Sequence, residues 1–171
     1  MEKRLFAKFY NSYMERMYKF VYFRVGGHKE LAQDLTQEIF LKVFEAFERY
    51  DPAISETSWL YTIARNHLIN YHAKQRPGAT IEEIEDSILC ADDARERFAR
   101  REDEKAVWDA LCHVPREDAE LIRMKYLEGW PFEDLAGYFQ KSSGALRVQA
   151  GRGLKKLKER LKKNHYDSLS S

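Results

Sequence analysis

The chain has 171 residues, of which 44% are hydrophobic and 33% are charged, and its formal net charge is +1. These values are typical of a soluble globular protein, and the length is sufficient for one ordinary domain or two small ones. No stretch approaches the roughly 20 apolar residues of a membrane span, and the N-terminal sequence lacks the continuous apolar core of a signal peptide. We therefore expect a cytoplasmic protein without direct membrane insertion.

The charges are distributed unevenly along the chain. Residues 1–76 carry 12 Lys and Arg against 9 Asp and Glu, residues 77–104 carry 4 against 10, residues 105–138 carry 4 against 7, and residues 139–171 carry 9 against 2. Two basic ends separated by an acidic middle are compatible with a chain that contacts DNA at both ends. An acidic surface linker would explain the middle segment equally well.

Apolar spacing predicts two helices in the first 50 residues. Large apolar side chains recur three and four positions apart across residues 3–25, and two consecutive glycines then supply a helix stop. A second apolar stripe predicts a helix from about Lys29 to Tyr50, which an Asp-Pro pair ends. The polar face of this second helix carries Asp34, Gln37, Glu38, Lys42, Glu45 and Arg49. Solvent exposure alone is the usual reason for such a face.

Residues 56–76 are expected to form a third helix, which Ser55 or Thr57 would cap. On a helical wheel its inward arc consists of Leu60, Ile63, Ala64, Leu68 and Tyr71. The two neighbouring arcs carry Trp59, Thr62, Asn66 and Asn70, followed by Tyr61, Arg65, His72 and Arg76. Aromatic rings stack on unpaired bases, amides hydrogen-bond base edges, and Arg or His contacts phosphate. The helix therefore suits single-stranded nucleic acid; the alternative is that Trp59 is partly core and the other side chains are simply solvated.

Pro77 and Gly78 are expected to end this helix and the first domain. Residues 77–104 are predicted to be an acidic linker, in which IEEIEDS forms either irregular chain or a weak short helix. The following segment, ADDARERFARREDE, is predicted to continue as a helix toward Cys112. Cys90 and Cys112 lack metal-binding spacing, so both are expected to be reduced thiols.

The last third of the chain has the pattern of a helix-turn-helix unit. One predicted helix follows Pro115 and stops at Gly129, a short helix covers residues 132–139, and Ser142 or Ser143 caps a longer basic helix. The inward side of that basic helix carries Leu146, Ala150, Leu154, Leu157 and Leu161. Its outward side carries Ser143, Arg147, Gln149, Arg152, Lys155, Lys156 and Lys158. Arg and Gln can read base edges and Lys contacts phosphate; the alternative is an amphipathic helix with a solvated basic face.

Small residues mark places where this unit departs from an optimised helix. Ala136 would let the short and long helices cross closely. Gly151 and Gly153 lie inside the basic helix, where each glycine costs about 0.5 to 1 kcal/mol relative to alanine. The two glycines either permit close approach to DNA or simply weaken the helix.

No pattern in the sequence carries catalytic chemistry. It contains no Gly-rich phosphate loop, no cluster of metal ligands and no Ser, His and acid arrangement identifiable by spacing, and the five histidines are scattered. We therefore expect a binding protein rather than an enzyme, with no cofactor, no metal and no small-molecule substrate.

Three segments, taken together, resemble bacterial RNA polymerase sigma factors of the extracytoplasmic-function (ECF) type within the sigma-70 family. They are ELAQDLTQEIFLKVFEAF, SWLYTIARNHLINY and VPREDAELIRMKYLEGWPFEDLAGYFQKSSGALRVQAGRGLKKLKERL, and the resemblance extends over about residues 5–161. It implies an all-α fold of two small helical domains. These would be region 2 at residues 1–76 and region 4 at residues 105–163, joined by an acidic linker at 77–104 and followed by a C-terminal tail at 164–171.

The resemblance also implies roles for individual residues. Binding to core RNA polymerase is assigned to Asp34, Gln37, Glu38 and Lys42. Contact with the minus-ten promoter element is assigned to Trp59, Arg65, Asn66, Asn70 and Arg76, with Asn66 close to the loop that captures a flipped base. Contact with the minus-thirty-five element is assigned to Ser143, Arg147, Gln149, Arg152, Lys155 and Lys156. The loop at residues 51–57 would shape which flipped base is accepted.

The sequence departs from the family pattern in the last helix. Family members often have a basic residue at the position of Gln149, and a His-Arg-Ala-Arg-like run where this chain has Gly151, Arg152, Gly153 and Leu154. The base contacts of the second domain therefore follow less directly from the resemblance than its fold does.

Two other classes of protein fit parts of the pattern. A helix-turn-helix transcription regulator would bind duplex DNA as a dimer without polymerase contact, and co-purification with core polymerase would distinguish it from a sigma factor. An interaction module would have its apolar helices covered by a regulatory protein. Many members of the ECF family are held by an anti-sigma factor, so such an inhibitor is a further expected partner.

Overall fold

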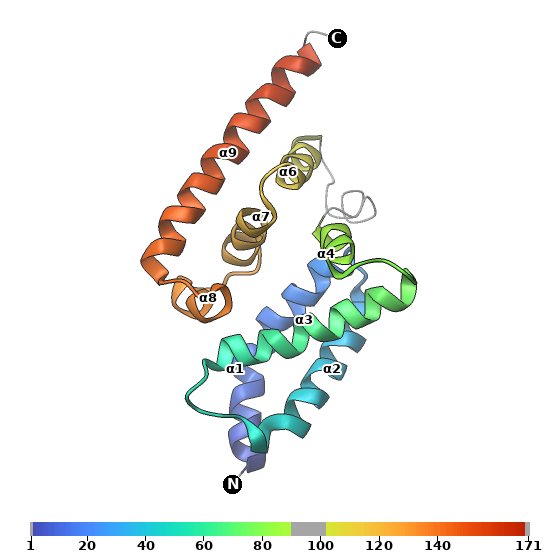
Figure 1. Cartoon of the computed structure of the whole chain (residues 1–171), viewed down its shortest axis with the longest axis vertical. Coiled ribbons are helices and arrows are strands. Elements are labelled where there is room, and N and C mark those ends of the chain that lie inside the picture. Colours follow the sequence, from blue (N-terminus) through green and yellow to red (C-terminus); the bar gives the residue numbers. More distant parts are fainter. Residues whose placement is uncertain (1, 90–101, 170–171) are drawn as a thin grey trace.

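The structure is a computed structural model that describes residues 2–89 and 102–169 (Figure 1). All regular secondary structure in these residues is helical, which confirms the predicted all-α class. No helix in this part of the chain combines the length and apolar character needed to cross a membrane.

The first three long helices form an N-terminal bundle. They are α1 (Glu2–Arg24), α2 (Lys29–Ala46) and α3 (Glu56–Gln75). The glycines at positions 26 and 27 have φ values of 63° and 77°, a left-handed conformation that favours glycine and allows the chain to reverse between α1 and α2. The last turn of the predicted second helix is a separate 3₁₀ turn, η1 (Phe47–Arg49). Met17, Phe20, Ile39, Val43, Leu60 and Ala64 fill the centre of this bundle.

The acidic segment after α3 contains a helix of its own, α4 (Ile81–Leu89), which packs against α3. Thr80 Oγ1 accepts a hydrogen bond from Glu83 N at 3.2 Å, and Thr80 N donates to Glu83 Oε2 at 2.8 Å. This reciprocal arrangement is a capping box, and Ile84 and Ile88 supply a buried face. The short helix is therefore a capped, packed element. Residues 90–101, where a further helix was predicted, lie outside the described part of the chain.

The C-terminal unit consists of α6 (Glu102–Cys112), α7 (Arg116–Ile122), α8 (Phe132–Phe139) and α9 (Ser143–Leu169). A π-helical turn, η2 (Arg123–Leu127), prolongs α7. Gln140 adopts a left-handed φ of 52° in the turn between α8 and α9, and Ser142 Oγ caps α9 by accepting from Ala145 N at 3.1 Å. Helices α8 and α9 form the predicted helix-turn-helix. Helix α9 continues beyond its predicted end at Leu161 and includes most of the predicted tail.

The N-terminal bundle and the C-terminal unit share one hydrophobic core. Helix α8 packs on α3, and Trp130, Leu135 and Leu146 belong to the same buried cluster as Phe20 and Tyr61. A second, smaller cluster lies between α6, α7 and α9 and contains Ala110, Leu111, Val114, Ala119, Ile122 and Leu157. The two halves of the chain are therefore in direct apolar contact in this structure (Figure 1).

Two predicted side-chain positions are wrong. Tyr61, predicted on an outward arc of α3, is fully buried because α8 covers it, with ring centroids 4.7 Å from Trp130 and 4.9 Å from Tyr138. Leu154, predicted to face inward on α9, is 37% exposed, because the neighbouring Gly153 is the position that faces α7. Both errors concern contacts between elements that a single helical wheel does not contain.

The two glycines of α9 have different environments. A Cβ atom on Gly153 would lie 3.0 Å from Ile122 Cδ1 and 3.4 Å from Asp118 Cβ, so this glycine lets α9 approach α7 closely. A Cβ atom on Gly151 would meet nothing within 4 Å. Close packing within the protein, rather than close approach to DNA, therefore explains Gly153.

Candidate nucleic-acid and polymerase interfaces

Helix α3 presents a row of exposed polar side chains. Its N-terminus is fixed by Ser55, whose Oγ accepts a hydrogen bond from Ser58 N at 3.4 Å, whereas Thr57, the other predicted cap, is buried. Asn66 and Asn70 are exposed one helical turn apart, and their side-chain amides have no hydrogen-bond partner among the described residues. Both amides are therefore free to pair with an external donor and acceptor.

Trp59 lies at one end of this row and is half-buried. Its ring centroid is 4.7 Å from that of Tyr50, 6.2 Å from that of Phe9 and 6.3 Å from that of Phe47. The aromatic cluster fixes the indole while leaving part of it open. The alternative that Trp59 is partly core is therefore right, and the fixed ring still offers a stacking surface.

Two basic candidates on α3 have different surroundings. Arg65 forms an ion pair with Glu85 of α4, and Glu85 also pairs with Arg116 Nη1 at 3.4 Å. Arg76, at the C-cap of α3, is exposed. Helix α4 therefore holds one of the two arginines predicted to contact DNA.

The polar face of α2 lies next to the row on α3. The four side chains predicted to bind polymerase, Asp34, Gln37, Glu38 and Lys42, are all exposed. Glu38 Oε2 lies 2.8 Å from His67 Nε2 of α3. Glu38, Lys42 and His67 line, together with Asn70, a groove of about 520 Å³ between α2 and α3. One small bundle thus carries the candidate polymerase face and the candidate single-strand face side by side.

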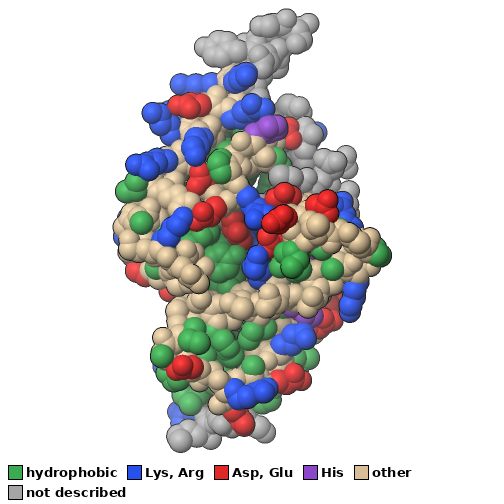
Figure 2. All heavy atoms as spheres, in the orientation of Figure 1, with side chains coloured by type: hydrophobic (Ala, Val, Ile, Leu, Met, Phe, Trp, Pro, Cys, Tyr) green, Lys and Arg blue, Asp and Glu red, His purple; other side chains and the backbone are tan. Residues whose placement is uncertain are grey.

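Helix α9 carries most of the exposed basic side chains of the C-terminal unit, and Figure 2 shows Lys and Arg side chains gathered along it. Arg147 Nη2 donates to Glu133 Oε1 at 2.6 Å, and its guanidinium lies 5.2 Å from the centroid of the Phe132 ring. Ser143 Oγ accepts from Arg147 Nη1 at 3.4 Å. Arg152 and Lys155 are exposed. The outward face predicted for this helix is present.

Two side chains of α9 that were predicted to contact bases or phosphates form hydrogen bonds with α7 in this structure. Gln149 Nε2 donates to Asp118 Oδ1 at 2.9 Å, and Lys156 Nζ lies 2.9 Å from Asp118 Oδ2. Burial would raise the pKa of Asp118, but the hydrogen bonds from Gln149 and Lys156 outweigh it and lower that pKa below its ordinary value. Asp118 was not identified from the sequence, because nothing in the periodicity of α7 indicates which of its acids faces α9.

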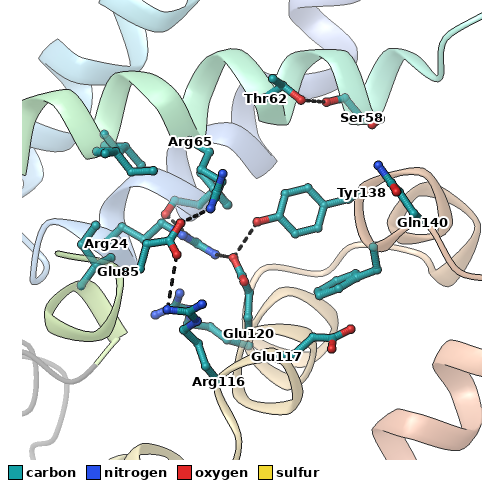
Figure 3. Close-up of a pocket in the computed structure, with 16 residues that line it drawn as sticks. Arg24, Ser58, Thr62, Arg65, Glu85, Arg116, Glu117, Glu120, Tyr138 and Gln140 are labelled. Carbon is teal, nitrogen blue, oxygen red and sulfur yellow. Dashed lines mark hydrogen bonds and ion pairs between the residues drawn. The ribbon is translucent and has the colours of Figure 1, made fainter. Parts of the chain in front are cut away.

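The contact between the two halves contains a buried cluster of charged side chains, also absent from the sequence predictions (Figure 3). Arg24 of α1 donates through Nη1 to Glu128 Oε1 at 2.7 Å and through Nη2 to Glu120 Oε1 at 3.3 Å. Tyr138 Oη donates to Glu120 Oε1 at 2.7 Å. Arg123 Nε lies 3.7 Å from Glu128 Oε1. This cluster borders a cavity of about 460 Å³ whose opposite wall includes polar side chains of α3.

The pKa shifts in this cluster reflect burial and mutual charge. Burial would lower the pKa of Arg24, but Glu128 and Glu120 outweigh it and raise that pKa above its ordinary value. Burial would raise the pKa of Glu120, but Arg24 and the hydrogen bond from Tyr138 lower it. Burial and the neighbouring Arg24 lower the pKa of Arg123 to about 10. Arg24 and Arg123 are therefore cationic and Glu120 is anionic near neutral pH.

No group of three or more His, Cys, Asp or Glu side chains in the described residues is arranged to hold a metal ion. Helix α3 instead carries an exposed row of amides beside the fixed ring of Trp59, and the adjacent face of α2 carries charges of both signs. Helix α9, the second helix of the helix-turn-helix, carries a basic face. Side chains of these kinds are suited to contacts with other macromolecules.

Comparison with known proteins identifies the family. Residues 9–77 match the model of sigma-70 region 2, and residues 104–157 match that of sigma-70 region 4. The RNA polymerase sigma factor CarQ of Myxococcus xanthus is 34% identical over 141 residues, which cover 81% of this chain and 79% of the relative. The ECF RNA polymerase sigma factor SigX of Bacillus subtilis is 23% identical over 165 residues, which cover 91% of this chain and 83% of the relative. The chain belongs to the sigma-70 family, in its ECF group.

Proposed function

We propose that this sigma factor binds core RNA polymerase through α2, holds the strand-separated minus-ten element on α3 and reads the minus-thirty-five element through α9. The observation that carries the proposal is the exposed amide row of α3, which lies beside a fixed indole and next to the polar face of α2. The corresponding units are residues 1–76 and 105–163. Residues 77–104 connect them, and 164–171 follow.

The proposed action on the minus-ten element is binding rather than catalysis. Extruding a base from a duplex costs a few kcal/mol. Stacking on Trp59 and hydrogen bonds to Asn66 and Asn70 are available to an extruded base and not to a paired one, so they favour the open promoter. Arg65 and Arg76 supply positive charge for the phosphates, and Arg65 must first leave Glu85.

The proposed contacts with the minus-thirty-five element lie on the outward face of α9. Arg147 and Arg152 have the side chains for base edges, and Ser143, Lys155 and Lys156 suit the sugar-phosphate backbone. Gln149 and Lys156 would exchange Asp118 for DNA, and Arg147 would exchange Glu133. The acidic partners hold these side chains when no DNA is bound.

The polymerase face of the proposal consists of Asp34, Gln37, Glu38 and Lys42 on α2. RNA synthesis belongs to the polymerase, so the sigma factor itself needs no catalytic residue, cofactor or small-molecule substrate. An anti-sigma factor that covers this face is the proposed inhibitory partner, and the cytoplasm, where polymerase acts, is the proposed location.

The direct test is transcription in vitro with purified core polymerase and a library of promoter templates. We expect specific transcripts that require both this protein and core polymerase, and the selected templates should share two separated sequence elements. A protein that binds a duplex but neither co-purifies with core polymerase nor supports any transcript would be a helix-turn-helix regulator instead, and the proposal would be wrong.

A further inference from the structure

Helix α9 exposes one large apolar side chain among polar and small ones. Val148 is 55% exposed, whereas Leu146, Ala150 and Leu157 of the same helix are buried. Leaving a valine side chain in water forgoes the free energy that burial of its methyl groups would give. Single exposed apolar residues are common on protein surfaces, so the meaning of Val148 depends on its position and on its neighbours.

The contacts of α9 with the rest of the C-terminal unit fix which side of the helix faces outward. Leu157 is buried in the smaller core cluster, and Gln149 Nε2 donates to Asp118 Oδ1 of α7 at 2.9 Å. With about 100° between successive residues, Val148 lies about 180° from Leu157 around the helix axis. Figure 1 shows α9 at the edge of the molecule, with α6, α7 and α8 on one side of it. Val148 therefore lies at the centre of the face that points away from the protein.

The positions one turn before and one turn after Val148 are both glycine. A Cβ atom on Gly144 or Gly151 would meet nothing within 4 Å among the described residues. Both positions lie within about 60° of Val148 around the helix axis. Val148 is therefore the projecting side chain between two stretches of bare backbone, and a ligand can reach it without meeting a neighbouring side chain.

The charged residues around Val148 indicate what kind of ligand this face fits. Arg152 and Lys155 are exposed and lie within about 40° of Val148 around the axis. Arg147, on the other side, is also exposed. A duplex presents base edges on the floor of a groove between two phosphate-bearing strands, so an apolar centre with cations beside it matches a DNA groove. An apolar protein partner would instead require a patch of several large apolar side chains.

The place of Val148 in the helix-turn-helix brings it to base edges rather than to phosphates. It lies in the second turn of α9, and in this motif the N-terminal residues of the second helix contact base edges in the major groove. Every base pair presents hydrogen-bonding groups there, but thymine alone adds a methyl group, at C5. Valine cannot hydrogen-bond a polar edge, which would lose its water without compensation. Contact with the thymine methyl group carries no such cost.

We propose that Val148 selects a thymine in the minus-thirty-five element by packing on the C5-methyl group of that base. The inference rests on the function proposed above for α9, and it adds a specificity-determining residue and the base that this residue selects. Any other base at that position places a polar edge, or no methyl group, against the valine side chain. Arg147 and Arg152 would read the neighbouring bases by hydrogen bonds.

The test removes the methyl group from the DNA while keeping the base pair. The templates that are transcribed from the promoter library supply the minus-thirty-five duplexes, and each thymine in them is replaced singly by deoxyuridine, which lacks only the C5-methyl group. Competition binding measures the affinity of the holoenzyme, formed from this chain and core polymerase, for each duplex. We expect about a four-fold loss at one thymine position, because burial of one methyl group changes an equilibrium constant by about that factor.

Val148→Ser removes both methyl groups of the side chain, and the exposed position and the similar helix propensities of serine and valine preserve the fold. This variant should bind the thymine duplex and the deoxyuridine duplex equally well. Val107→Ser is the matched control, because it makes the same change at a valine of α6 that is 38% exposed in the same unit. The control should keep the four-fold difference, and circular dichroism confirms that both variants fold.

The inference is wrong if no thymine of the element shows a loss on replacement, or if Val148→Ser keeps the difference seen in the wild type. A loss of affinity for core polymerase in Val148→Ser, with the two duplexes still distinguished, would assign Val148 to a protein contact instead. A holoenzyme that transcribes the templates but ignores the methyl group refutes this inference alone. A chain that supports no transcript from any template refutes the proposed function, and this inference with it.

Discussion

At the scale of single residues, the environment of a side chain decides what its type can do. Asn66 and Asn70 are available for an external ligand because they are exposed and unpartnered among the described residues, whereas Gln149 and Lys156 are held by Asp118. Trp59 combines a packed side with an open side. Asn66, Asn70 and Trp59 are therefore preorganised for the proposed contact with single-stranded DNA. Gln149 and Lys156 must exchange Asp118 for DNA before they can make the proposed contact with the duplex.

The two glycines of α9 give a test of packing at this scale. Gly151→Ala should raise the free energy of unfolding by about 0.5 to 1 kcal/mol, because alanine is the better helix former and its Cβ atom meets nothing. The free energy of unfolding of Gly153→Ala should be about 1 kcal/mol lower than that of Gly151→Ala, because the added Cβ atom would press on Ile122 and Asp118. Denaturant unfolding of both variants measures the difference. Equal stabilisation by the two substitutions would contradict this prediction, because it would show that α7 moves away from the added methyl group without a loss of stability.

At the scale of elements, the helix-turn-helix is held together by charges as well as apolar contacts. Arg147 of α9 pairs with Glu133 of α8, and backbone hydrogen bonding at Glu133, followed by this pairing, lowers the pKa of the carboxyl group. Asp118 of α7 holds two side chains of α9. Three side chains of the proposed reading surface, Arg147, Gln149 and Lys156, thus have acidic partners within the same unit.

Substitutions in α9 separate base reading from phosphate contact. Arg147→Ala should weaken binding to a duplex containing the minus-thirty-five element by about 1–3 kcal/mol and reduce discrimination against a scrambled duplex. Lys156→Ala should weaken binding to both duplexes alike. It should also reduce the slope of log binding constant against log salt concentration by about one, because one phosphate contact is lost. Titrations at several salt concentrations measure both effects. Equal losses on specific and scrambled duplexes for Arg147→Ala would exclude it from base reading.

Much of each element was predictable from the sequence, because caps, glycine stops and apolar spacing act within a few residues. The stop at residues 26 and 27, the caps at Ser55 and Ser142 and the helix at 132–139 follow from such local patterns. Contacts between elements were not predictable in the same way. The burial of Tyr61 depends on α8, a helix more than 70 positions further along the chain, and the partners of Arg24 are equally remote.

At the scale of the whole molecule, the units that carry the two proposed DNA-binding surfaces pack against each other. The acidic segment takes part in this contact, because Glu85 of α4 pairs with Arg65 of the bundle and with Arg116 of the C-terminal unit. The acidic segment noted in the sequence therefore has a structural role in this contact.

The central claim is that α3 holds strand-separated DNA while the protein is bound to polymerase. The most direct measurement is promoter opening by the reconstituted holoenzyme, followed with a fluorescent base analogue in the minus-ten element, for wild type, Asn66→Ala and the control Gln75→Ala, an exposed amide on the same helix. We expect Asn66→Ala to reduce the opening equilibrium roughly five- to ten-fold through the lost hydrogen bond, with duplex binding and the control unchanged. Normal opening by Asn66→Ala, or an equal loss in duplex binding, would contradict the account.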